Sequence, residues 1–237
     1  FYRLHFGEDT PFFKIATEGG FLNQPVEMAS IDMSPGERNE IMIDLSDGAN
    51  ATLIADLLPA DPDDSGRWFA RTPQANVVEL RVDPTIGAAG TLPDTLNDID
   101  YFDRADATQI RTFSLEMEVR GGTRDNMNLF AINGRPMEMS TINERVSKGD
   151  VEIWRITADR MPHNFHLHGA SFQILTHHGS APAEADRGWK DTVVVWDEVT
   201  EIIVRFDHEA TGEFPYMYHC HILEHEDYGM MGQFTVE

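Results

Sequence analysis

The segment 219–221, His-Cys-His, constrains the fold most strongly, and it contains the only cysteine of the chain. Successive side chains of a strand point to opposite faces, so the two histidines face one way and Cys220 faces the other. A second cluster upstream, residues 163–168 with the pattern H-x-x-H-x-H, follows the same rule. A fold that brings the two segments together therefore forms two ligand groups, one with Cys220 and one made of imidazoles.

The group with Cys220 combines a thiolate, two imidazoles and a thioether. Its members are His163, Cys220, His225 and Met230. Two histidines and a cysteine with a weak axial methionine are the ligands of a blue-copper electron-transfer centre. A structural zinc site takes more cysteines at short spacing, whereas calcium and magnesium bind oxygen ligands. The pattern therefore predicts copper.

The other group consists of imidazoles alone. Its members are His166, His168, His219 and His221. Such a set suits copper that binds dioxygen, because imidazole is a common copper ligand. The two groups share a backbone, since Cys220 has a covalently bonded histidine on each side. An electron that arrives at the Cys220 copper would cross one residue to reach the imidazole-bound coppers.

The two motifs together resemble the carboxy-terminal copper signature of the multicopper oxidases, a family that includes laccases and bacterial cuprous oxidases. Residues 187–192 (RGWKDT) and 218–231 (YHCHILEHEDYGMM) are most similar to the bacterial three-domain members. Residues 18–22 (EGGFL) and 35–38 (PGER) resemble the family's middle domain. The resemblance implies an all-β fold of cupredoxin-like Greek-key domains, each a β-sandwich or barrel.

The resemblance also implies a role for each ligand. His163, Cys220, His225 and Met230 match the type 1 copper ligands, His166 matches a type 2 ligand, and His168, His219 and His221 match type 3 ligands. Glu226 matches an acidic position implicated in proton delivery to the oxygen site. Asp159 and Met161 resemble a pair through which electrons reach the type 1 copper. The alternatives are a surface carboxylate for Glu226 and ordinary loop residues for the other two.

In the family, the three-copper cluster takes eight histidines, four of them from two H-x-H motifs in the first domain. This chain has H-x-H pairs only at 166/168 and 219/221. We therefore expect an absent amino-terminal domain to supply the other four histidines, and we expect this chain alone to be inactive as an oxidase. The resemblance further implies a periplasmic or secreted location.

The formal net charge of −23 limits the possible partners. Nucleic acids and anionic lipid surfaces select basic faces, so neither is an expected partner. An acidic surface favours the approach of cations, including cuprous ions and aromatic amines. The apolar runs of the sequence are too short for a membrane span, and a single cysteine allows no internal disulfide.

Short strands with alternating burial dominate the pattern. Phe113, Leu115, Met117 and Val119 alternate with polar residues, and 41–45, 77–82, 151–156, 193–196, 202–206 and 233–236 have a similar strand-like composition. Residues 222–228 predict a short helical turn that ends at Gly229. We predict a partial middle domain at 1–84, a linker at 85–108, and a complete cupredoxin domain at 109–237 that carries the copper ligands.

These patterns predict an oxidase that takes single electrons from a small reducing substrate at a type 1 copper. Four such electrons would reduce dioxygen to water at the completed cluster. A copper-binding electron-transfer or structural module without oxidase turnover is the alternative. A copper nitrite reductase is a third possibility, but a mononuclear catalytic copper does not need both histidines of the His-Cys-His segment. The sequence leaves open whether the reductant is a phenol, an aromatic amine, a pigment or a metal ion.

Overall fold

The chain divides into two compact units, Phe1–Ile99 and Asp100–Glu237. The computed structural model describes residues 1–7, 10–58, 74–87, 90–117 and 130–237. Strands dominate both units, and the described helical segments are short: α1 (Leu223–Asp227) and the 3-10 turns η1 (Arg104–Asp106) and η2 (Glu184–Asp186). The predicted all-β class is therefore confirmed. The division between the units lies within residues 85–108, and no helix among the described residues is long and apolar enough to cross a membrane.

The first unit contains two small sheets. One has the order β4-β1-β6-β7, with β1 (Tyr2–His5), β4 (Ile31–Met33), β6 (Ala51–Leu57) and β7 (Ala75–Leu80). The other has the order β3-β2-β5, with β2 (Phe12–Thr17), β3 (Gly20–Met28) and β5 (Glu40–Met42). Its buried apolar cluster is small and is centred on Phe6 and Phe12, whose rings meet edge to face at 5.9 Å.

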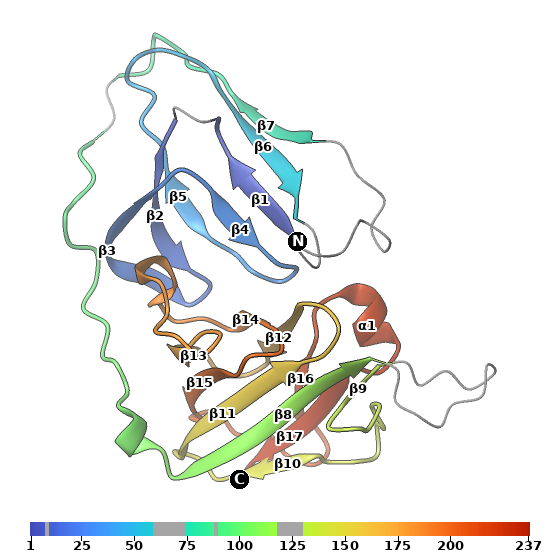
Figure 1. Cartoon of the computed structure of the whole chain (residues 1–237). Helices are drawn as coiled ribbons and strands as arrows, with labels where there is room; N and C mark the ends of the chain where they lie inside the picture. The colour runs from blue at the N-terminus through green and yellow to red at the C-terminus, as the bar shows by residue number, and fades with distance from the viewer. Residues whose placement is uncertain (8–9, 59–73, 88–89, 118–129) are drawn as a thin grey trace. The chain divides into compact units, whose positions relative to one another are not determined.

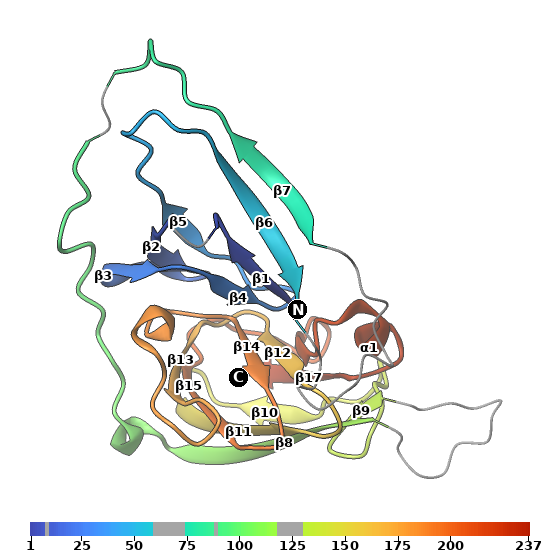
Figure 2. The same cartoon turned by 45° about the horizontal axis from the view of Figure 1, so that its top comes forward.

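The second unit is built from two five-stranded sheets (Figures 1 and 2). The first has the order β10-β17-β16-β12-β14, with β10 (Glu144–Val146), β12 (His163–Leu167), β14 (Thr192–Val195), β16 (Tyr216–His219) and β17 (Met231–Val236). The second has the order β13-β15-β11-β8-β9, with β8 (Gln109–Met117), β9 (Phe130–Ile132), β11 (Val151–Ala158), β13 (Phe172–Thr176) and β15 (Thr200–Arg205).

A dense aromatic core joins these two sheets into a sandwich. Trp154 of β11 is fully buried and contacts Phe165 of β12, Tyr218 of β16 and Phe234 of β17, all with ring centroids within 6.0 Å. Its indole N–H donates a hydrogen bond of 2.8 Å to the Glu152 carboxylate, so the polar edge of the ring has a partner. Truncation of such a side chain to alanine typically costs about 3–5 kcal/mol. The core therefore fixes β12 and β16, which contain His163, His166 and His219 and lead directly into His168 and Cys220.

Most of the predicted strands form, with shifted ends. The largest differences are at two strands: the one predicted at 41–45 stops at Met42, and the one predicted at 77–82 stops at Leu80. Ile43 and Leu45 pack against the small core of the first unit without joining a ladder. The Val82 N–H donates to the side-chain oxygen of Asn50 instead of to a neighbouring strand. The Val119 end of the predicted alternation lies outside the described residues.

Candidate metal centre

The sulfur-containing group converges tightly in the structure. The Cys220 Sγ lies 3.6 Å from the Nδ1 atoms of both His163 and His225, and those two nitrogens are 3.0 Å apart. His163 and Cys220 are fully buried, and His225 is 6% exposed. We name these three residues and Met230 the sulfur group. One sulfur and two nitrogen donors thus face a common point in a dry environment.

The spacing of these three atoms fits a metal ion. A point equidistant from atoms with separations of 3.6, 3.6 and 3.0 Å lies about 2.0 Å from each of them. Imidazole and thiolate bonds to zinc, a comparable ion, are about 2.0–2.3 Å long. The donor set itself is the one that blue-copper sites use. The residues present therefore fit copper by both size and chemistry.

The hairpin of β16 and β17 explains why Met230 returns to Cys220. His219, the last residue of β16, pairs with Met231, the first residue of β17. Directly beyond this pair, the Cys220 N–H donates a 3.0 Å hydrogen bond to the Met230 carbonyl. Met230 is fully buried in the core of the second unit. The register therefore holds the thioether residue beside the cysteine, where an axial ligand is predicted.

Helix α1 fills the connection between the two strands and places His225. The helix matches the predicted turn at 222–228, and the N–H of His225 donates to the Ile222 carbonyl at 2.9 Å. Gly229 follows with a φ of 102°, in the left-handed region that favours glycine. A β-carbon there would approach Pro136 to 3.2 Å. Gly229 therefore lets the chain turn sharply from α1 into Met230.

Burial shifts the pKa of every titratable ligand of the sulfur group toward its neutral form. Burial lowers the pKa of His163 to about 3, and the charge of His225 adds to the effect. Burial likewise lowers the pKa of His225 to about 4, and it raises the pKa of the Cys220 thiol to about 12. Both imidazoles are thus ready to bind a cation, whereas the thiol would lose its proton when a metal binds.

The imidazole residues gather on the other side of Cys220. His166 of β12 pairs with His219 of β16, and their rings lie 5.2 Å apart. His168 follows two residues later on the same face, with its Nε2 3.1 Å from the His219 Nε2. Ligand atoms of these three residues lie within 4.8 Å of one another. The ring of His221 adjoins the set at 5.4 Å from His166. We name these four histidines the imidazole group.

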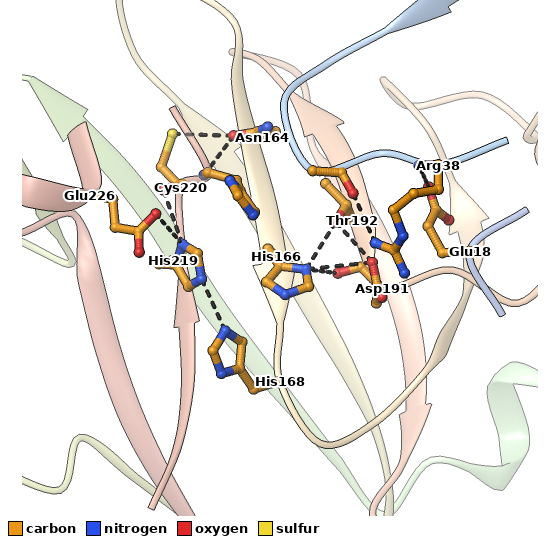
Figure 3. A network of polar contacts seen from close by, with 12 residues as sticks. Glu18, Arg38, Asn164, His166, His168, Asp191, Thr192, His219, Cys220 and Glu226 are labelled. Atoms are coloured by element: carbon orange, nitrogen blue, oxygen red, sulfur yellow. Dashed lines mark hydrogen bonds and ion pairs between the residues drawn. The ribbon is translucent and has the colours of Figure 1, made fainter. Parts of the chain in front are cut away.

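The orientation of His166 is set by Asp191 and Thr192, two residues of the 187–192 segment for which the sequence predicts no role in the site. Its Nδ1 lies 3.0 Å from the Asp191 carbonyl oxygen and 2.9 Å from the Thr192 hydroxyl. The Thr192 hydroxyl in turn donates to the Asp191 carboxylate at 2.9 Å. Because the carbonyl oxygen accepts, Nδ1 carries the proton and Nε2 remains the metal-binding atom. Figure 3 shows this arrangement beside the His219–His168 contact.

Glu226, predicted to deliver protons, lies next to the imidazole group. Its Oε2 is 3.3 Å from the Nδ1 of His219, and its side chain is about a quarter exposed at 27%. The same Nδ1 lies 3.1 Å from the carbonyl oxygen of Cys220. The carboxylate therefore links a ligand to the solvent side, although its part in proton delivery stays a prediction.

Asp159 and Met161 form a tight turn directly before β12. The Met161 N–H donates to the Asp159 carbonyl at 2.7 Å across Arg160, whose φ of 65° is positive. The Asp159 carboxylate accepts the N–H of Met117 at 2.8 Å, which ties this turn to β8. The main chain of Asp159 also acts on the His163 imidazole, partly offsetting the lowered pKa of that ring. The turn leads directly into His163, the first residue of β12, and a role in electron transfer stays a prediction.

The imidazole group borders a cavity of about 840 Å³ in the second unit. His166, His168 and Asp191 line it together with Trp189, His208 and Tyr216, among others. The imidazoles of His166 and His168 are half-buried, in contrast to the closed sulfur group. Burial lowers the pKa of His168 to about 4, with the charges of neighbouring histidines adding to the shift. This face of the sheet is thus open to further ligands.

A sequence profile of the multicopper oxidases matches residues 109–237, which is more than half of the chain. The chain belongs to the multicopper oxidase family. Among solved structures, the laccase-like multicopper oxidase CueO from Ochrobactrum sp. covers the whole chain with a TM-score of 0.83 and 33% identity. The McoA multicopper oxidase from Aquifex aeolicus superimposes with a TM-score of 0.79 at 29% identity. The cupredoxin-like fold expected from the resemblance is therefore confirmed.

Curated relatives carry a different name. The cell division protein FtsP from Proteus mirabilis is 32% identical over 239 residues, which cover 99% of this chain and 48% of that protein. FtsP from Escherichia coli is 31% identical over 235 residues, with the same coverage of 99% and 48%. The chain spans 52% of the Ochrobactrum oxidase. It thus spans about half the length of the relatives that it matches.

Proposed function

We propose that this chain forms part of a copper-dependent oxidase that takes single electrons from a reductant and passes them to dioxygen. The observation that carries the proposal is the placement of two ligand groups on opposite sides of Cys220. One side holds a sulfur donor and two imidazole nitrogens within 3.6 Å. The other side holds three imidazoles whose ligand atoms lie within 4.8 Å. A protein that only stores or carries electrons needs the first group alone.

In this proposal, His163, Cys220, His225 and Met230 would hold one copper. His166 serves a type 2 copper, and His168, His219 and His221 serve a type 3 pair. Copper in these groups would accept single electrons beside Cys220 and reduce dioxygen to water at the cluster. The protein keeps both imidazoles of the sulfur group neutral and dry, and it fixes the tautomer of His166 through Asp191 and Thr192.

The open imidazole group supports the proposal that the cluster is completed from outside this chain. His166 and His168 border the 840 Å³ cavity, so they can share a metal with ligands that arrive from that side. The other half of the relatives' length offers a source for such ligands, because the chain covers only 48% of the Proteus protein. We propose that four further histidines come from that preceding part.

The residues near α1 are consistent with an organic or metal-ion reductant that donates electrons at the protein surface. His163 and His225 are buried, so a bulky reductant has no direct access to either ring. Phe130 stacks on His225 with ring centroids 4.4 Å apart and lies 6.1 Å from Tyr228, which is 56% exposed. The acidic net charge of −23 favours cationic reductants such as aromatic amines or cuprous ions. The Ochrobactrum relative is described as acting on lignin model compounds and lignosulfonate.

Glu226 is proposed to carry protons toward the imidazole group, because it joins solvent to the Nδ1 of His219 at 3.3 Å. Asp159 and Met161 are proposed to help electrons reach the sulfur group, since their turn directly precedes His163. Glu226→Gln should slow oxygen reduction about a hundredfold and leave the reduction of the blue centre unchanged. Equal slowing of both steps would contradict the role in proton delivery.

Stopped-flow spectroscopy of the complete copper-loaded protein tests the proposal. An anaerobic phenol or aromatic amine should bleach the blue absorption, and dioxygen should restore it within the turnover time. Electron counting should give water as the product rather than hydrogen peroxide. A blue centre that bleaches but recovers only slowly in air would show an electron carrier without oxidase turnover.

A second candidate is a structural module that acts in cell division without oxidase turnover. The 32% identity to the Proteus FtsP across 99% of the chain favours it. The double variant Cys220→Ser with His168→Ala separates the two candidates. It should abolish oxygen consumption and leave a structural role in division intact. A division defect in cells that carry only this variant would argue that copper chemistry is needed there.

A periplasmic or secreted location also stays a proposal, and it accords with an enzyme that meets extracellular reductants. Fractionation of cells that produce the complete protein would test it directly. Recovery of the protein with the cytoplasmic markers would contradict the location.

A further inference from the structure

Asn164 occupies the point where the two ligand groups meet. It lies on β12 between His163 and Phe165, and it is fully buried. Its side-chain Oδ1 accepts a 2.7 Å hydrogen bond from the main-chain N–H of His221. The same oxygen lies 3.4 Å from the Cys220 Sγ. Figure 3 shows the amide of Asn164 reaching toward the sulfur.

The contact with His221 decides which end of the amide faces the sulfur. Amide oxygen and nitrogen are assigned from their hydrogen-bonding partners. The His221 main-chain N–H can only donate, so the partner within 2.7 Å must be an acceptor. The carbonyl oxygen of Asn164 is therefore held in this position, and rotation of the amide would place two donors against each other.

A fixed carbonyl oxygen has a defined electrostatic effect on a metal-bound thiolate. Such a thiolate carries no proton, so it cannot donate a hydrogen bond to the oxygen. The negative end of the amide dipole then faces an electron-rich sulfur at 3.4 Å, in a site where Cys220 is 0% exposed. Dipoles act strongly in such a dry interior. The repulsion grows when an added electron makes the site more negative.

We propose that Asn164 is a positioning residue that lowers the reduction potential of the copper held by Cys220. Its side chain also holds the Cys220 sulfur and the main chain of His221 in a fixed relative position. The proposal rests on the proposed function, because it requires copper in the sulfur group. The electron comes from the reductant, which is oxidised by one electron as Cu(II) becomes Cu(I). Asn164 itself transfers no proton and forms no bond in this step.

A lower reduction potential at this copper would favour electron transfer toward the imidazole group. The sulfur group must pass its electron on to the imidazole group, and a lower potential increases the driving force for that transfer. The oxygen of Asn164 also contacts both ends of the path, Cys220 and His221, across sequence separations of 56 and 57 residues. One side chain thereby couples the geometry of the two groups.

The test compares Asn164→Ala with Asn143→Ala in the complete copper-loaded protein. Asn143 is a matched control because its Oδ1 also accepts a main-chain N–H, that of Gln233 at 3.0 Å, and it belongs to neither ligand group. The readout is the ratio of reduced to oxidised blue centre at fixed applied potentials. Asn164→Ala should raise this ratio about tenfold, which is about 59 mV for one electron. Asn143→Ala should leave it unchanged.

Asn164→Asp provides a second variant that keeps an acceptor for the His221 N–H. On the alkaline side of a pH series, the ionised carboxylate should lower the potential below that of the wild-type protein. An unchanged potential in Asn164→Ala, an equal shift in Asn143→Ala, or an aspartate variant that never falls below the wild type would each overturn the inference. A wild-type protein without a blue centre would instead overturn the proposed function.

Discussion

The sulfur group and the imidazole group both draw on β12 and β16 and on the residues that follow these strands, yet their surroundings differ. The sulfur group is closed: His163, Cys220 and Met230 are fully buried, and three donor atoms lie within 3.6 Å. The imidazole group is open, because His166 and His168 border a cavity of about 840 Å³. One group can therefore be tested within this chain, whereas we propose that the other takes further ligands from elsewhere.

The difference follows from local structure. The ladder between β16 and β17 and the short helix α1 return His225 and Met230 to Cys220, so a single hairpin supplies three ligands. The imidazole group comes from the facing register of β12 and β16 on the opposite surface of the sheet. Side chains on such a surface can share a metal with further ligands only when another part of the protein covers the surface. The two groups should therefore respond separately to substitution.

The largest expected effect is the loss of the sulfur group's blue absorption when Cys220 is replaced. Cys220→Ser removes the only thiolate, so the blue absorption from sulfur-to-copper charge transfer should disappear completely. Copper in the imidazole group should remain, because those ligands point to the other face. Visible and electron paramagnetic resonance spectra of the copper-loaded protein would check this. Persistent blue colour would show that Cys220 is not a ligand.

The reverse experiment targets the imidazole group. His168→Ala should reduce oxygen consumption of the complete protein by more than about a hundredfold, because a cluster ligand is lost. The blue absorption should stay, since His168 does not contact the sulfur group. His208→Ala is the matched control: His208 lines the same cavity and is not a predicted ligand. Loss of the blue centre in His168→Ala would show that the groups are not independent.

The buried imidazoles make the metal-free protein sensitive to acid. The pKa of His163 is lowered to about 3 and that of His225 to about 4, below the usual 6.5 of the unfolded chain. As the pH falls from about 6.5 toward 4, the unfolded chain binds more protons than the folded one, so stability is lost. Each imidazole should cost about 1.4 kcal/mol per pH unit in this window.

Urea unfolding of the chelator-treated protein at several pH values would measure this dependence. His225→Gln should make the slope shallower, because it removes one of the two imidazoles whose pKa is lowered. A free energy of unfolding that stays constant between pH 6.5 and 4 would contradict the burial of neutral imidazoles.

The smallest expected effect concerns the axial position of the sulfur group. Met230→Leu removes a weak thioether and keeps the three strong ligands, so copper should stay bound and the reduction potential should rise. Met231→Leu is the matched control, because Met231 begins β17 and belongs to neither group. Redox titration of the blue absorption measures both. Loss of the copper in Met230→Leu, or an unchanged potential, would show that Met230 is not axial.

The division into two groups could be predicted from the sequence because it depends only on strand periodicity. Residues 163, 166 and 168 and the segment 219–221 alternate along their strands, and the structure keeps that order. The supporting residues could not be predicted in this way. Asn164 reaches His221 across 57 residues, and Asp191 reaches His166 across 25. Such contacts depend on which strands pair, and the spacing of residues within one strand does not predict which strands pair.

The strand ends show a similar limit. Apolar composition continues through Leu45 and Val82, but the ladders stop at Met42 and Leu80. An apolar side chain can pack against a core without its backbone joining a sheet, and Ile43 does so. The stacking of Phe130 on His225 could likewise not be predicted from local sequence, because it joins β9 to α1 through the fold alone.

Copper content measured together with oxygen uptake tests the central claim most directly. Residues 1–237 alone should bind one blue copper per molecule, accept one electron from a reductant, and consume no dioxygen in steady state. The complete protein should bind that copper and the three of the cluster, and it should reduce dioxygen continuously. Steady oxygen consumption by residues 1–237 alone, or a complete protein that binds a single copper, would contradict the account of one closed and one shared group.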